Sequence, residues 1–179
     1  MQSETTFERV HSSDADRLHA MAGRIYHQHY ADLWEDRGAQ YLRDALSVEK
    51  LRDELSQPQA RFFYIQSRLE SAGFIKFNLP AESGENDGLY LERLYLDEAF
   101  TGRSLGKLGL QFAEQQAIEL GIERVWLKAM AYRDDVCRFY ARHGYTACGE
   151  STLSFPKVVH GRTKMITFEK RISRQSDAT

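Results

Sequence analysis

The stretch AFTGRSLGKLG, residues 99–109, lies between a run of alternating apolar residues and a run with helical periodicity. It holds three glycines and two cations, Arg103 and Lys107. Glycine lets a backbone approach a ligand closely, and the first turn of a helix leaves N–H groups unpaired. A phosphate or pyrophosphate is therefore the expected ligand of this strand-to-helix turn. The alternative is an ordinary tight turn whose glycines serve only the corner.

Two well-known phosphate loops do not match this spacing. A Walker A loop has about four residues between its glycines and ends in Gly-Lys-Ser/Thr. Here Gly102 and Gly106 enclose three residues, and Leu108 follows the lysine. A dinucleotide fingerprint reads G-x-G-x-x-G, whereas Gly102, Gly106 and Gly109 give G-x-x-x-G-x-x-G.

Composition predicts one domain at residues 1–173 and a short disordered tail at 174–179. The chain has 179 residues, of which 42% are hydrophobic, and a net charge of −2, so no nucleic-acid surface is predicted. No apolar run approaches the roughly 20 residues that span a bilayer, and the first residues lack the pattern of a secretory signal. We expect a cytoplasmic protein without a membrane partner.

The cysteine and histidine spacing predicts neither disulfides nor a metal site. Cys137 and Cys148 fit reduced thiols better than a disulfide framework. His27 and His29 are two residues apart, which places them on different faces of a helix. No Cys/His cluster has the spacing of metal ligands.

Periodicity and capping signals predict a helical first third followed by strands. A helix is expected at 12–30, opened by Ser12, Ser13 and Asp14, and another at 48–55, capped by Ser47. Two antiparallel strands are expected at 60–67 and 73–80, joined by a polar turn at 68–72, and a third at 88–96.

The second half of the chain predicts helices alternating with strands. The elements expected are a helix from 105 to 120, a strand at 123–130, a helix at 134–144 and a closing hairpin of 144–155 with 163–172. Gly121 is in the position of a C-cap glycine. The apolar side of the first of these helices is expected to contain Leu105, Leu108, Phe112, Ala113, Ala117 and Leu120.

Three segments together resemble the GNAT superfamily of acetyl-CoA dependent N-acetyltransferases: LERLYLDEAFTGRSLGKLG, VWLKAM and YRDDVCRFYARHGY. The family loop reads Gln/Arg-x-x-Gly-x-Gly/Ala, and TGRSLG occupies it with Thr101 and Ser104 as departures. RFYARHGY is similar to the family's Phe-Tyr-x-x-x-Gly-Phe/Tyr segment. The resemblance covers about residues 57–172 and is nearest to bacterial polyamine (spermidine/spermine) acetyltransferase-like proteins, through LERLYL, SVEKLRDELS and GYTACGES.

This resemblance implies an α/β (α+β) GNAT-like fold, with a central mixed, mostly antiparallel, twisted sheet that is splayed at the cofactor site and flanked by helices. It implies direct transfer of the acetyl group of the co-substrate acetyl-CoA to a primary amine of a small molecule, such as a polyamine or an amino acid, without a metal. Homodimers are common among similar proteins. Two alternatives stay open: a noncatalytic acyl-CoA-binding sensor or regulatory module, suggested by Thr101 and Ser104, and a protein or peptide amine acetyltransferase.

The resemblance also implies cofactor contacts. Main-chain groups at Leu94–Leu96 would bind the pantetheine arm as an inserted pseudo-strand, amides at 101–107 would bind the pyrophosphate, and Arg142 would reach a nucleotide phosphate. The full expected set is Leu94, Tyr95, Leu96, Thr101, Gly102, Arg103, Ser104, Leu105, Gly106, Lys107, Arg133, Val136 and Arg142. For Arg133 and Arg142 the alternative is a solvated helix face.

Acyl transfer to an amine needs two proton movements. An alkylammonium with a pKa of about 10.4 must lose a proton, and Glu92 is the candidate base, directly or through water. The alternative is an exposed carboxylate paired with Arg93 or a lysine. The coenzyme A thiolate must gain a proton, and Tyr140 matches the family's general acid, with a core role as the alternative. Cys137 is not assigned as a nucleophile, because no histidine lies near it in sequence.

Acceptor residues are expected on the first helix and near the last hairpin. Tyr26, Tyr30 and Trp34 recur every four residues, so they would line one side of a pocket or form an aromatic core stripe. The hairpin loop carries Lys157, His160, Arg162 and Lys164. These cations would repel a polyamine, which favours a smaller amine, an amino acid or another carboxylate-bearing amine.

Overall fold

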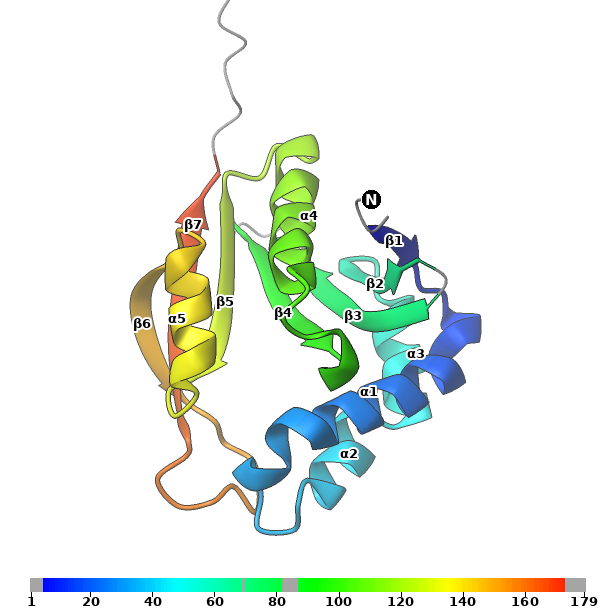
Figure 1. Ribbon diagram of the computed structural model, residues 1–179, viewed down its shortest axis with the longest axis vertical. Coiled ribbons are helices and arrows are strands. Elements are labelled where there is room, and N and C mark those ends of the chain that lie inside the picture. The colour runs from blue at the N-terminus through cyan, green and yellow to red at the C-terminus, as the bar shows by residue number, and fades with distance from the viewer. Residues whose placement is uncertain (1–4, 69, 82–86, 173–179) are drawn as a thin grey trace, which may run out of the picture.

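The computed structural model describes residues 5–68, 70–81 and 87–172 and contains a seven-stranded sheet in the order β1-β2-β3-β4-β5-β7-β6 (Figure 1). The strands are β1 (Thr5–Arg9), β2 (Ala60–Ser67), β3 (Glu70–Asn78), β4 (Leu89–Leu96), β5 (Arg124–Met130), β6 (Thr146–Thr152) and β7 (Lys164–Arg171). Neighbouring strands are antiparallel except β4 and β5, which are parallel. The predicted mixed, mostly antiparallel sheet is confirmed.

Helices pack on both faces of this sheet and enclose two apolar clusters. They are α1 (Ala15–Tyr30), α2 (Ala39–Ala45), α3 (Val48–Ser56), α4 (Leu105–Glu119) and α5 (Asp134–Arg142). Side chains alternate across a strand, so Phe74 joins the cluster under α1, whereas Ile75 and Phe77 join the one under α4. Figure 1 shows α4 and α5 in front of the sheet.

The two halves of the sheet separate between β4 and β5. The parallel ladder joins only Leu89–Leu91 to residues 125–127, and the strands diverge after it (Figure 1). Residues 92–96 of β4 therefore keep β3 on one side but face an opening, with no β5 partner, on the other. This seam agrees with the splayed sheet that the family resemblance implies.

The strand-to-helix turn forms as predicted. Gly102 has φ 74° and Ser104 has φ 63°, both in the left-handed region that turns the chain sharply into α4. Gly121, with φ 71°, ends the helix as expected. The predicted apolar face of α4 is wrong at Leu120, which is 54% exposed, because this residue is the C-cap that follows the last residue of the helix.

Three elements differ from the sequence predictions. β1 was not predicted, because TTFER lacks an apolar alternation; it is an edge strand whose Phe7 stacks on Phe112 of α4 at 4.0 Å. α2 was not predicted as a separate helix, and β3 begins at Glu70 rather than at Gly73. The predicted tail at 174–179 lies outside the described residues.

We predict that Gly73→Ala destabilises the protein. An added Cβ would lie 2.0 Å from the carbonyl oxygen of Tyr95 on the neighbouring strand, and a backbone atom cannot move aside cheaply. Forced overpacking should lower the free energy of unfolding by about 3 kcal/mol, as measured by urea denaturation. The matched control is Gly23→Ala in α1, where a Cβ meets nothing within 4 Å. This substitution should raise the free energy of unfolding by up to about 1 kcal/mol. Equal stability of Gly73→Ala and the wild type would contradict the account.

Candidate active site

The seam opens into a cavity of about 740 Å³. Its lining comes from α1, β4, the turn before α4, β5 and α5. All the predicted site residues line this cavity except Arg103, whose guanidinium lies over the ring of Phe100 at 5.1 Å. Segments that are far apart in sequence thus meet at one cavity.

One end of the cavity combines the open first turn of α4 with two cations. The first turn of α4 is closed by the bond from the N–H of Leu108 to the carbonyl of Ser104, 3.1 Å, so the preceding N–H groups of the helix face the open end. Gly106 sits against Phe139 of α5, 3.2 Å from where its Cβ would be, so only glycine fits without displacing the ring. Lys107 and Arg142 line the same cavity and supply positive charge.

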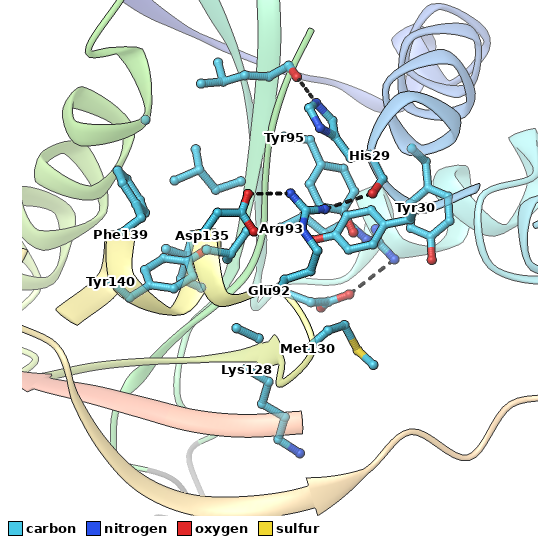
Figure 2. A pocket seen from close by; sticks show the side chains of 18 of the residues that line it. His29, Tyr30, Glu92, Arg93, Tyr95, Lys128, Met130, Asp135, Phe139 and Tyr140 are labelled. Atoms are coloured by element: carbon cyan, nitrogen blue, oxygen red, sulfur yellow. Dashed lines mark hydrogen bonds and ion pairs between the residues drawn. The ribbon is translucent and has the colours of Figure 1, made fainter. Parts of the chain in front are cut away.

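A β-bulge places Glu92 at the start of the seam. Phe77 pairs with Leu91 and Lys76 with Arg93, so Glu92 is the extra residue on β4. The bulge resets the alternation of the strand and puts Glu92 and Arg93 on the same side of the sheet, facing the cavity (Figure 2).

Glu92 belongs to a network of two carboxylates and two cations. Its carboxylate lies 2.6 Å from Nζ of Lys76 and 3.2 Å from Nη2 of Arg93, and it accepts a 2.7 Å bond from Asn78. The same cations hold the buried Glu54, at 2.9 Å and 2.7 Å. Glu92 is therefore paired with Arg93 and a lysine, as the alternative to a catalytic base predicted. Its side chain is nevertheless 24% exposed and lines the cavity.

Burial and charge act in opposite directions on Glu54. Desolvation alone would raise the pKa of its carboxyl, but hydrogen bonds and charges from Arg93 and Lys76 outweigh this and hold the pKa below its usual value. Glu54 is therefore ionised at neutral pH, and the network is neutral overall.

Tyr140 lies on α5 beside Phe139 (Figure 2). Its ring is also near those of Tyr145 and Phe168. It lines the cavity, and burial raises the pKa of its phenol. The hydroxyl thus stays protonated at neutral pH, which a proton donor requires.

Arg133 and His29 tie the two sides of the seam together. Arg133 donates to both oxygens of Asp135, at 3.0 and 2.9 Å, and to the carbonyl of His29 at 2.8 Å. His29 Nε2 lies 2.7 Å from the carbonyl of Leu96 and must carry a proton, because that oxygen only accepts. The hydrogen bond from Arg133 lowers the pKa of Asp135 to about 2, so this pair persists across the neutral range. Sequence reasoning weighed His29 only as a metal ligand and missed this role.

Tyr26 and Trp34 are both core residues and cavity walls. They are 5% and 3% exposed, and Trp34 Nε1 donates to the Tyr26 hydroxyl at 3.1 Å. Tyr41, which the sequence did not single out, stacks on both rings at 4.6 and 5.0 Å, and Tyr30 stacks on Tyr26 at 5.1 Å. These aromatic residues therefore both line a pocket and form part of the core, so the two interpretations offered by the sequence are compatible.

The loop between β6 and β7, residues 153–163 and here called the strap, does not act as predicted. Its backbone binds the α1–α2 connection through Val159 N–H to Leu33 O and Glu35 N–H to Lys157 O, both 2.9 Å. Figure 1 shows the strap meeting that connection below the seam.

The predicted basic character of this region is largely cancelled. Lys157 pairs with Asp36 at 3.7 Å, Arg162 with Asp32 at 2.7 Å, and Lys164, just after the strap, with Glu150 at 2.7 Å. Neither these three cations nor His160 lines the cavity. The expectation that this region repels a polycationic acceptor therefore has no support in their positions.

No group of three or more His, Cys, Asp or Glu side chains among the described residues gathers as metal ligands would. None of the helices in that part of the chain combines the length and apolar character needed to cross a membrane.

We predict that Glu54→Gln destabilises the fold by about 3 kcal/mol at pH 7, because it removes the buried partner of two cations. The pKa of Glu54 is lowered on folding, so its contribution is present above its unfolded value, about 4.3, and is lost as pH falls further. Urea denaturation should show a smaller difference in the free energy of unfolding between the wild type and Glu54→Gln at pH 3 than at pH 7. The control is Glu49→Gln, exposed on the same helix. A difference that stays constant with pH would contradict the assignment.

Comparisons with known proteins agree with this geometry. A family model described as the acetyltransferase (GNAT) family matches residues 26–145. An uncharacterized N-acetyltransferase from the pepI 3' region of Lactobacillus delbrueckii subsp. lactis is 30% identical over 115 residues, 63% of this chain. The match spans 66% of that relative's length.

Solved structures share the fold at low sequence identity. The PaiA N-acetyltransferase of Thermoplasma acidophilum in complex with coenzyme A superposes with a TM-score of 0.74 at 21% identity, covering 94% of this chain and 99% of that one. The ribosomal-protein-S18-alanine N-acetyltransferase of Escherichia coli gives 0.71 at 15% identity, covering 98% and 99%. At these identities the likeness extends to the fold alone, and the nearness to polyamine acetyltransferases implied by the sequence motifs is not confirmed.

Proposed function

This chain belongs to the acetyltransferase (GNAT) family, and from that premise we propose that it is an N-acetyltransferase that transfers the acetyl group of acetyl-CoA to a primary amine of a small molecule. The observation that carries the proposal is the seam: β4 and β5 separate after three paired residues, beside the open first turn of α4. A long, thin co-substrate with phosphates at one end suits this shape.

The residues along the seam fit coenzyme A. Beyond the ladder, β4 has no β5 partner, so main-chain groups at Leu94–Leu96 can pair with an extended pantetheine arm. We assign the pyrophosphate to the amides at 101–107, with Lys107 and Arg142 as counter-charges. Gly102 has nothing within 4 Å of where a Cβ would be, so a ligand can approach its backbone closely.

Glu92 and Tyr140 are the proposed proton-transfer groups. Acetyl-CoA supplies an activated thioester, so the protein must remove a proton from the amine and return one to the sulfur. Both oxygens of Glu92 already receive contacts from Lys76, Asn78 and Arg93, so the amine would reach it through water more readily than directly. Tyr140 is protonated and faces the same cavity, as the donor should.

Arg133 was expected to bind acetyl-CoA, but its hydrogen bonds point to another role. Its guanidinium is already used by Asp135 and by the carbonyl of His29. We therefore propose that Arg133 shapes the wall of the seam rather than binding a phosphate.

A small acceptor fits the closed side of the cavity better than a folded protein. The strap and the α1–α2 connection are joined by two backbone hydrogen bonds and two ion pairs. A peptide acceptor entering there would have to displace them. A protein or peptide amine is thus the second candidate, and the noncatalytic acyl-CoA-binding module is the third.

We predict that Tyr140→Phe lowers kcat by about 100-fold or more, because general acid catalysis is worth this much. Thiol release from acetyl-CoA with a panel of primary amines measures it, and calorimetry checks that coenzyme A still binds. Tyr132→Phe is the matched control, since Tyr132 lies just before the same helix but its hydroxyl interacts with Asp32 at 3.4 Å.

Undiminished turnover in Tyr140→Phe would remove Tyr140 as the acid. Tight coenzyme A binding by the wild type without turnover of any primary amine would favour the noncatalytic module instead.

A further inference from the structure

Lys128 of β5 and Glu92 of β4 come at matching positions of the two strands, where the seam begins. Tyr90 of β4 and Trp126 of β5 are register partners whose rings stack at 4.1 Å, so their side chains share one face of the sheet. Two residues further along each strand, just past the end of the ladder, come Glu92 and Lys128. Both line the cavity. In Figure 2 the Lys128 side chain extends from β5 with its ammonium directed away from Glu92.

The charges that line the cavity are unequal. Among the described residues, the carboxylates that line it are Glu92 and Asp135, and both are held by cations. Its Lys and Arg side chains are Arg93, Lys107, Lys128, Arg133 and Arg142. Arg93 and Arg133 are paired with carboxylates, and Lys107 and Arg142 are assigned to the phosphates.

Lys128 is the remaining Lys or Arg side chain of the cavity lining, with neither a described carboxylate partner nor an assigned phosphate. Its side chain is exposed, and it forms no hydrogen bond or ion pair with the described residues. It lies on β5, away from the turn that is assigned to the pyrophosphate.

Apolar side chains continue the cavity beyond Lys128. Met130 is the next residue on the same face of β5, its register partner on β7 is Met165, and both line the cavity together with Leu153 of the strap. A ligand that extends from Glu92 past β5 to the Lys128 ammonium would therefore meet a charged group at each end and apolar side chains along the same cavity wall.

We propose that the acceptor is a primary amine that carries a carboxylate, and that Lys128 binds this carboxylate while the amine faces Glu92. This inference rests on the proposed function and names the substrate class of that site. A polyamine would bring a second ammonium toward Lys128 and find no carboxylate free of a cation, which disfavours it. A cation of the cavity wall, Lys128, thus disfavours a polyamine, whereas the cations of the strap do not.

The test compares a short ω-amino acid with its carboxamide and with a diamine of equal length. The wild type should show a kcat/KM for the acid about tenfold or more above that for the amide, because a hydrogen bond to a charged group is worth this much. Lys128→Met should bring the ratio close to one, and Lys128→Arg should largely restore it. Lys128→Glu should shift the preference to the diamine.

Lys164→Met is the matched control, because Lys164 pairs with Glu150 and does not line the cavity; its ratio should equal that of the wild type. The proposal is overturned if the wild type prefers the amide or the diamine, or if Lys128→Met keeps the wild-type ratio.

A binding measurement separates this inference from the proposed function. The acid and the amide are titrated by calorimetry into protein saturated with coenzyme A. If no amine is turned over, the proposed function fails, yet Lys128 should still give the acid about tenfold tighter binding than the amide, and Lys128→Met should abolish that difference. Equal affinities in the wild type would overturn the inference whatever the activity.

Discussion

The parting of β4 and β5 is the constraint on which the rest of the structure depends. Three paired residues hold two halves of one sheet together, and beyond them each strand keeps a free edge. Unpaired backbone edges in a protein are normally covered or filled, because unsatisfied N–H and C=O groups cost free energy when buried. Here α1 and α5 reach across the opening through Arg133 and His29, and the strap joins the halves below it. These contacts hold the two halves of the sheet together while the facing edges of β4 and β5 stay unpaired, so an extended ligand can pair with them.

Charge in the seam is arranged in pairs. The bulge at Glu92 brings a carboxylate to the surface of the cavity, and Lys76, Arg93 and Glu54 hold it from behind. A buried network of this kind contributes little net stability compared with apolar packing, so its value lies in fixing one side chain in one place. Asp135 is fixed in the same way by Arg133. Against this neutral background the cations without a carboxylate partner stand out, and they lie where anionic parts of ligands are expected.

Much of this organisation could be predicted from local sequence. The glycine turn, the capped helices and the alternating strands depend on nearest neighbours, and the motif around RFYARHGY located α5. β1 could not be predicted, because a five-residue edge strand is stabilised by distant partners such as Phe112. The ion pairs of the strap and the contact between His29 and Leu96 join residues far apart in sequence, so no spacing reveals them. Alternation along a strand places Lys128 on the same face as Trp126 and Met130, but only the tertiary structure shows that no described carboxylate pairs with it.

The central claim is that the seam is a binding site for coenzyme A. A crystal structure of the protein with coenzyme A tests it most directly. The account predicts the pantetheine arm beside Leu94–Leu96 of β4, the pyrophosphate against the backbone at the start of α4, and the sulfur near Tyr140. Coenzyme A bound on another surface, or a seam that stays empty at saturating ligand, would contradict it.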